Sequence, residues 1–255
     1  MRKIHFLAGC LFCIVLATQL HAQTSDEKSS TYNPVDFTMQ LKNMHLWRGY
    51  VVSNTALADV DLGVKSKNGQ WKAGVWGAAG FTGVYKEFDY YLSYSKKGFT
   101  AAFWDIYNFS ENATWNNKEV FNYEDGQCGH ILDLSVAYQL QGKFPLKASW
   151  ATLLYGRDKD SRNDKNRYST YVELGYPVLK SKKVNLDFGL GGAFALKPEP
   201  GCKANFYSSK PNIVNINFTA SKTVTLGCYA LPVSAMVMWN PELNHANIQL
   251  ALNIF

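Results

Sequence analysis

Hydrophobic and polar residues alternate with a period of two along most of this chain. In residues 130–140, for example, Leu132 and Leu134 alternate with Asp133 and Ser135. This period puts the apolar side chains on one face of a β-strand and the polar side chains on the other. The alternation predicts twelve strands, at residues 35–46, 56–66, 69–79, 84–95, 98–108, 130–140, 144–155, 167–178, 183–195, within 212–226, 230–239 and 245–255.

Two-faced strands of about ten residues are typical of a membrane-spanning β-barrel, whose outer face meets lipid and whose inner face lines a polar lumen. The loop lengths favour the same fold. The three longest connections, 109–129, 156–166 and 196–211, follow odd-numbered strands, whereas the connections after even-numbered strands are short. Membrane barrels have short periplasmic turns and longer external loops. The strands of a soluble β-sandwich also alternate with a period of two, but nothing in that fold places the long loops at one end and the short loops at the other.

We therefore predict an all-β fold over residues 35–255, a membrane-spanning antiparallel up-and-down β-barrel of about twelve strands. Residues 220–229 are ambiguous, because their alternation does not separate two strands clearly. A barrel of ten strands therefore stays open as an alternative.

The N-terminus has the features of a secretory signal peptide. Arg2 and Lys3 precede an apolar stretch, and Ala22 offers a small residue for cleavage. This pattern predicts a signal peptide over residues 1–22. The following residues, 23–34, are polar and rich in Ser and Thr, which predicts a short flexible leader.

Composition narrows the class of protein further. Aromatic residues make up 15% of the chain and charged residues only 18%. Aromatic girdles at the two membrane interfaces explain this balance. We expect five tryptophans in these belts: Trp71, Trp76, Trp104, Trp150 and Trp239. The formal charge of +6 falls to +4 once the two basic residues of the signal peptide are removed, so nucleic acid is not an expected partner.

Cysteine usage points to no cofactor. Cys128, Cys202 and Cys228 remain after the predicted cleavage. Their odd number and the lack of a CxxC pair speak against a metal site. A bridge between Cys128 and Cys202 stays open, since both lie in long loops.

The end of the first predicted strand carries a motif that we recognise. Its sequence is Leu46-Trp47-Arg48-Gly49, which resembles the Trp/Phe-Arg-Gly signature of the TorF-like porins, a family of bacterial outer-membrane β-barrel proteins. Three further segments are similar to that family: Ala73-Gly74-Val75-Trp76-Gly77, Phe88-Asp89-Tyr90-Tyr91 and Trp239-Asn240-Pro241. The resemblance implies an outer-membrane barrel with a pore and implies no particular substrate.

The C-terminus departs from the common pattern of such barrels. A terminal aromatic residue usually points to the same face as the outward apolar residues of its strand. Here the outward residues are Leu250, Leu252 and Ile254, so simple alternation would point Phe255 to the opposite face. We expect either a bulge before Phe255 or a turn of the last residue at the rim.

The polar strand faces supply the candidate lumen residues. The acidic candidates are Asp59, Asp61, Glu87, Asp89, Asp133, Glu173 and Asp187. The basic candidates are Lys42, Lys72 and Lys147. Rings of charge in a narrow pore select ions by sign, so this excess of acids predicts a lumen that favours cations. The alternative is a salt-bridged plug that closes the barrel, because buried charges need partners.

Arg48 has two interpretations. It is either a constriction or ligand-binding cation, or an arginine paired with Asp59 or Asp61 on the next strand, with Gly49 permitting a tight bend. We favour the pair, because the guanidinium fork suits carboxylates.

These observations predict an outer-membrane porin for passive diffusion of small solutes or ions. One alternative is a closed structural or surface-binding barrel that acts through its external loops. Another is a barrel enzyme at the rim using His130 near Asp133, which we do not expect, since no GxSxG motif is present. The expected partners are the lipid bilayer, the barrel-assembly machinery and the transported solute, and we expect a monomer.

Overall fold

The structure is a computed structural model that describes residues 32–255. The predicted signal peptide, and all but the last three residues of the predicted leader, lie outside the described residues. No helix in the described part of the chain is long and apolar enough to cross a bilayer.

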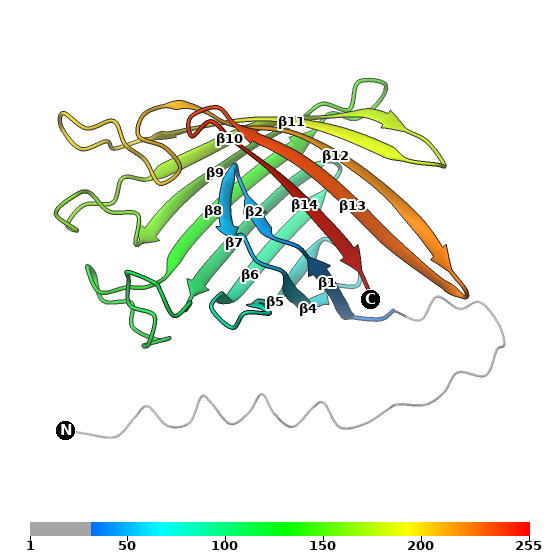
Figure 1. The fold of residues 1–255 in the computed structure, drawn as a ribbon, viewed down its shortest axis with the longest axis horizontal. Coiled ribbons are helices and arrows are strands. Elements are labelled where there is room, and N and C mark those ends of the chain that lie inside the picture. Colours follow the sequence, from blue (N-terminus) through cyan, green and yellow to red (C-terminus); the bar gives the residue numbers. More distant parts are fainter. Residues whose placement is uncertain (1–31) are drawn as a thin grey trace, which may run out of the picture. The chain divides into compact units, whose positions relative to one another are not determined.

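Twelve strands of residues 32–255 close into an antiparallel barrel (Figure 1). They are β1 (Val35–Lys42), β4 (Leu57–Lys65), β5 (Trp71–Gly80), β6 (Lys86–Lys96), β7 (Phe99–Asn108), β8 (Ile131–Gln139), β9 (Lys147–Gly156), β10 (Ser169–Lys180), β11 (Asn185–Ala195), β12 (Asn212–Leu226), β13 (Tyr229–Asn240) and β14 (His245–Asn253). Each strand pairs with its neighbours in the chain, and β1 pairs with β14 to close the ring. The predicted fold and all twelve predicted strands are confirmed.

The ambiguous segment at 220–229 forms the end of β12 and a tight turn. β12 runs to Leu226 and β13 starts at Tyr229, so only Gly227 and Cys228 connect them. Gly227 has a φ of +62°, which glycine adopts without steric cost. The ten-strand alternative is therefore wrong.

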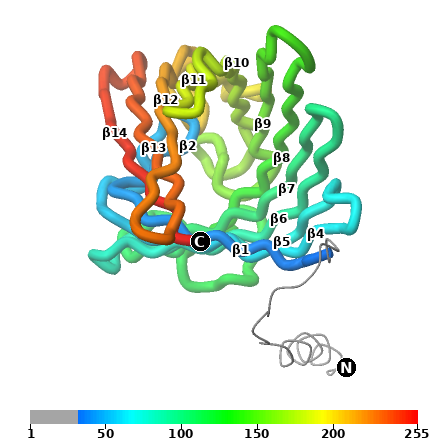
Figure 2. The backbone as a smooth tube through the Cα atoms, turned by 90° about the vertical axis from the view of Figure 1, so that its right-hand side faces the viewer, coloured from blue at the N-terminus to red at the C-terminus, as the bar shows by residue number. Residues whose placement is uncertain are grey.

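Two short strands do not belong to the barrel wall. β2 (His45–Trp47) and β3 (Tyr50–Ser53) pair only with each other, within the connection from β1 to β4. Figure 2 shows β2 inside the ring of barrel strands. The predicted strand at 35–46 is thus too long, because the chain leaves the wall at Asn43. The side chain of Asn43 bonds the β14 backbone there, donating to Ile248 and accepting from Leu250.

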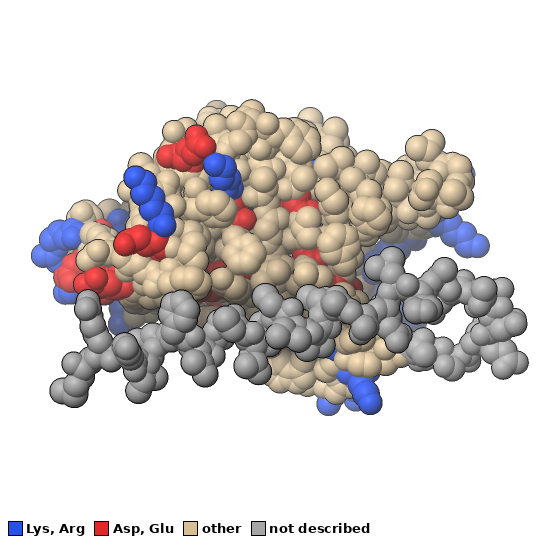
Figure 3. Space-filling model, turned by 90° about the horizontal axis from the view of Figure 1, so that it is seen from below, with Lys and Arg blue, Asp and Glu red and all other residues tan. Residues whose placement is uncertain are grey.

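The outer face of the barrel is apolar. Side chains such as Leu62, Val237 and Leu250 alternate with inward polar residues and expose 44%, 52% and 51% of their surface. Figure 3 shows that charged side chains gather mainly toward the end of the external loops, while much of the visible side is uncharged. Soluble proteins do not normally leave so large an apolar surface in water.

The tryptophans divide between the two faces. Trp71, Trp150 and Trp239 are exposed on the outer face, as predicted for interfacial belts. Trp76 and Trp104 instead point into the barrel, where Trp76 donates to Asp59 and Trp104 stacks on Tyr91 at 4.5 Å. The prediction that they belong to the interfacial belts was wrong. Their positions on β5 and β7 alternate with the outward apolar residues, so they face inward together with the polar residues.

Ile254 and Phe255 both lie opposite Met39 of β1, which is the pattern of a β-bulge rather than of a turn at the rim. β14 ends at Asn253, and the backbones of Ile254 and Phe255 bond Met39 of β1. The ring of Phe255 lies 6.0 Å from the ring of outward-facing Phe37. The terminal aromatic therefore reaches the outer face in spite of its phase.

Candidate functional site

The strand registers place all ten candidate lumen residues on the inner face. Each occupies a position that alternates with outward apolar side chains on its own strand. Asp59, Glu87, Asp89 and Asp133 are buried, whereas Lys147 and Asp187 are exposed within the lumen. Geometry then divides the ten residues into paired and unpaired groups.

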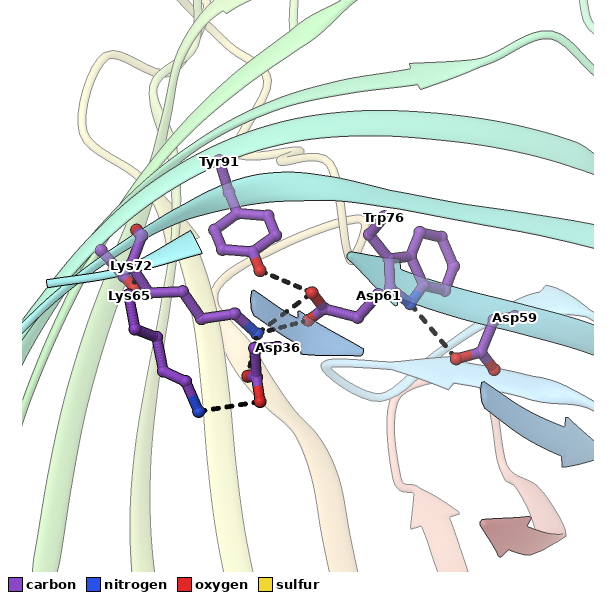
Figure 4. Close-up of polar contacts among 8 residues, drawn as sticks. Asp36, Asp59, Asp61, Lys65, Lys72, Trp76 and Tyr91 are labelled. Atoms are coloured by element: carbon purple, nitrogen blue, oxygen red, sulfur yellow. Dashed lines mark hydrogen bonds and ion pairs between the residues drawn. The ribbon is translucent and has the colours of Figure 1, made fainter. Parts of the chain in front are cut away.

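One group forms an ion-pair network on β1, β4, β5 and β6 (Figure 4). Lys72 bridges Asp36 at 2.9 Å and Asp61 at 3.1 Å. Lys65 bonds the same Asp36 at 2.8 Å, and the hydroxyl of Tyr91 donates to Asp61. The network neutralises these carboxylates across neighbouring strands, as expected where charges are partly withdrawn from water.

A second pair extends this wall. Lys42 of β1 forms an ion pair with Asp59 of β4, at 2.9 Å. The indole nitrogen of Trp76 donates to the other oxygen of Asp59 at 3.2 Å. Both of the acids that sequence analysis offered to Arg48, Asp59 and Asp61, therefore have lysine partners.

The Trp-Arg-Gly motif forms the tip of the inward hairpin. Arg48 and Gly49 have φ values of +50° and +81° and connect β2 to β3. A two-residue hairpin turn with positive φ at both positions matches the twist of its strands. The tip reaches the wall at β12 and β13, where the side-chain amide of Asn240 donates to the Gly49 carbonyl at 3.0 Å.

Arg48 crosses the lumen to Asp133 on β8. Its two terminal nitrogens donate to the two carboxylate oxygens at 2.8 and 2.7 Å, and one of them also bonds the Tyr207 hydroxyl at 3.0 Å. The predicted carboxylate pair exists, but the prediction of Asp59 or Asp61 as partner was wrong. A hairpin that leaves the wall carries Arg48 away from β4, and the strand pattern gave no signal for that path.

The hairpin lies between two cavities. A cavity of about 710 Å³ is lined mainly by β8–β13, with Glu173, Asp187, Lys147 and Lys180 among its charged groups. A second cavity of about 510 Å³ lies against β5–β8. Arg48 lines both. The hairpin therefore forms a constriction between two compartments of the lumen, each of which has charged side chains in its lining.

The charge of the lumen is nearly balanced. The smaller cavity contains Glu87, Asp89 and Asp133, and also three basic side chains, Lys42, Arg48 and Arg157. The strand faces alone carry more acids than bases, because Arg48 and Arg157 belong to connections between strands. Only the folded chain brings them to the inner face.

His130 lies outside the lumen, under the long loop 109–129. It is fully buried, with Nδ1 2.6 Å from Asp105 and Nε2 2.7 Å from the Val120 carbonyl. The rings of Tyr107 and Tyr123 pack against it at 4.4 and 4.3 Å. The structure does not bring His130 together with Asp133, which faces the lumen and binds Arg48.

The loops at the end predicted to be external are held by polar contacts among themselves. Glu242 in the β13–β14 turn accepts bonds from Ser209 and from Asn212 at the start of β12. These bonds hold the pKa of Glu242 below its usual range. Cys128, Cys202 and Cys228, the cysteines of residues 32–255, are free thiols, so the bridge left open by sequence analysis is absent.

Comparison with known proteins adds little to this description. No family model and no curated protein matches the chain. One solved structure that matches is the COG4313 outer membrane channel from Pseudomonas putida F1. It is 12% identical, the match covers 91% of this chain and 98% of that chain, and the TM-score is 0.44. The barrel therefore rests on the strand pairing of this chain, and the resemblance to TorF-like porins stays a prediction.

Proposed function

We propose that this chain is an outer-membrane barrel that lets small polar solutes or ions diffuse through a lumen narrowed by the β2–β3 hairpin. The observation that carries the proposal is a polar cavity of about 710 Å³ enclosed by a barrel with an apolar outer face. An apolar outside suits lipid, and a hydrated polar inside suits a solute.

The membrane location has a direct test on the outer face. Leu134 lies in the middle of β8 with 40% of its surface exposed. We expect Leu134→Arg to lower the free energy of unfolding in a bilayer by about 2–4 kcal/mol, because the charge must enter hydrocarbon. Ser135→Arg, which points into the lumen, is the matched control and should cost less. Equal effects in urea titrations of the two variants would contradict a lipid-facing β8.

The transport proposal is tested by electrical recording. The chain from residue 23 to residue 255, refolded into a planar bilayer, should give discrete conductance steps. Folding is checked by the change in electrophoretic mobility on heating. A folded barrel that never conducts would refute the pore and favour the closed, loop-presenting alternative.

The finer proposal is a modest preference for cations. Asp187 faces the larger cavity, and no ion pair within residues 32–255 involves it. Asp187→Asn should therefore reduce the reversal potential measured in a salt gradient. Glu111→Gln, in an external loop, is the control that should leave it unchanged. A lumen with no cation preference before substitution would overturn this part of the proposal alone.

A further inference from the structure

The smaller cavity is unusually aromatic for a polar lumen. Indole rings line it from four separate places: Trp47 on β2, Trp76 on β5, Trp104 on β7 and Trp115 in the loop 109–129. Faces of aromatic rings attract cations, and indole does so most strongly. Arg48 and Arg157 lie over the Trp47 and Trp115 rings. Trp76 and Trp104 are therefore the rings that favour a positively charged guest with an organic surface.

Two carboxylates of β6 face the same cavity. Glu87 and Asp89 are 8% and 4% exposed. Glu87 accepts a bond from Asn108 at 2.8 Å, and one oxygen of Asp89 accepts from the Tyr107 backbone at 3.2 Å. The other oxygen, Oδ2 of Asp89, accepts no hydrogen bond within residues 32–255 and is not among their fully buried polar atoms, so it is accessible from the cavity. A carboxylate oxygen that is free and accessible can accept a charge-assisted hydrogen bond from a cation in the cavity.

The basic side chains that line the cavity form no ion pair with Glu87 or Asp89. Lys42 is bound to Asp59, and Arg48 to Asp133. Arg157 alone is left, and its guanidinium lies 3.8 Å from the centre of the Trp115 ring. No ion pair within residues 32–255 joins Arg157 to either acid. The two carboxyl groups therefore share one nearby guanidinium, and neither forms an ion pair with it.

We propose that this cavity, between the β2–β3 hairpin and β5–β8, binds a small organic monocation, an alkylammonium or guanidinium solute. The ammonium meets Asp89 and Glu87, and its carbon chain lies against the indole rings. A hydrated metal ion would need several oxygen ligands, whereas the rest of this lining is largely aromatic. This inference rests on the proposed function, because it names the class of solute that enters the lumen.

The test uses n-butylammonium chloride as the probe, added to the refolded chain in detergent at constant ionic strength. Tryptophan fluorescence is the readout, since four of the seven tryptophans line the cavity. We expect saturable binding of n-butylammonium, and none of potassium ion or of uncharged n-butanol over the same range. If the fluorescence of the unmodified chain changes equally with all three solutes, or with none of them, the proposal is overturned.

Two variants locate the site. Asp89→Asn should weaken n-butylammonium binding by about tenfold or more, because a buried charge partner is removed. Asp187→Asn removes an equal charge from the other cavity and should change binding by less than about twofold. Unchanged binding in Asp89→Asn, with folding verified by heat-dependent mobility, would contradict the assignment. If that variant does not fold, Trp104→Leu provides the same comparison.

Failure of this inference is separable from failure of the pore. A chain that conducts but does not bind n-butylammonium keeps the proposed function and loses the site. A chain that binds n-butylammonium but stays silent in the bilayer keeps the site and loses the diffusion function.

Discussion

Replacing Gly49 by alanine is expected to force the tip of the β2–β3 hairpin away from the barrel wall. A Cβ at this position would lie 2.1 Å from the carbonyl oxygen of Val214 and 2.8 Å from its carbonyl carbon. Both are backbone atoms of β12, so no side-chain rotation can relieve the overlap. The φ of +81° adds a conformational cost of about 1–2 kcal/mol for a residue that has a Cβ.

The expected total loss is about 3 kcal/mol in the free energy of unfolding, measured by urea titration in detergent or lipid. Single-channel conductance should rise as well, since the hairpin forms the constriction. Gly83→Ala is the matched control, because Gly83 has a φ of +77° and nothing within 4 Å of its added Cβ. If the two variants lose the same stability, the hairpin does not press on β12.

Replacing Asp133 by asparagine is expected to produce the second large effect. The side chains of Arg48 and Asp133 are only 15% and 2% exposed. Removing one partner of a buried pair leaves the other charge uncompensated, which costs about 3–5 kcal/mol. The loss should appear in urea unfolding and should be accompanied by a mobile hairpin, detectable as new proteolysis near Arg48.

The control for this prediction is an exposed ion pair in which the acidic partner is likewise replaced by its amide. Lys86 and Glu111 are 37% and 64% exposed and lie 3.0 Å apart. Glu111→Gln should change the free energy of unfolding by less than about 1 kcal/mol, as surface pairs usually do. An Asp133→Asn variant as stable as Glu111→Gln would mean that Arg48 finds another acceptor and that the pair does not fix the hairpin.

The two predictions concern the part of the molecule that sequence reasoning described least well. The motif Trp47-Arg48-Gly49 was noticed and its turn was anticipated from Gly49. The position of this turn inside the barrel could not be predicted. A period of two shows which face of a strand a residue occupies, but it does not show whether the strand stays in the barrel wall. The partner Asp133 is 85 positions away in the chain, and no local pattern connects residues at that separation.

The smaller cavity illustrates the same limit. Glu87 and Asp89 were found from alternation on one strand, since every second residue of β6 faces inward. Trp76 and Trp104 have that same phase, so alternation alone could have placed them inside. Arg157 and Trp115 come from connections between strands, where there is no period to follow. Only loop packing brings them to the cavity.

The sequence by itself predicted a barrel of about twelve strands, their inner and outer faces and the end that carries the long loops. It could do so because a β-strand repeats every two residues and each neighbour in the chain is also a neighbour in the barrel. The tertiary structure decided where the β2–β3 hairpin lies, which charges neutralise each other and where an acid remains unpaired. These features depend on side chains meeting across the lumen, and distances across a closed barrel follow from its closure rather than from local sequence.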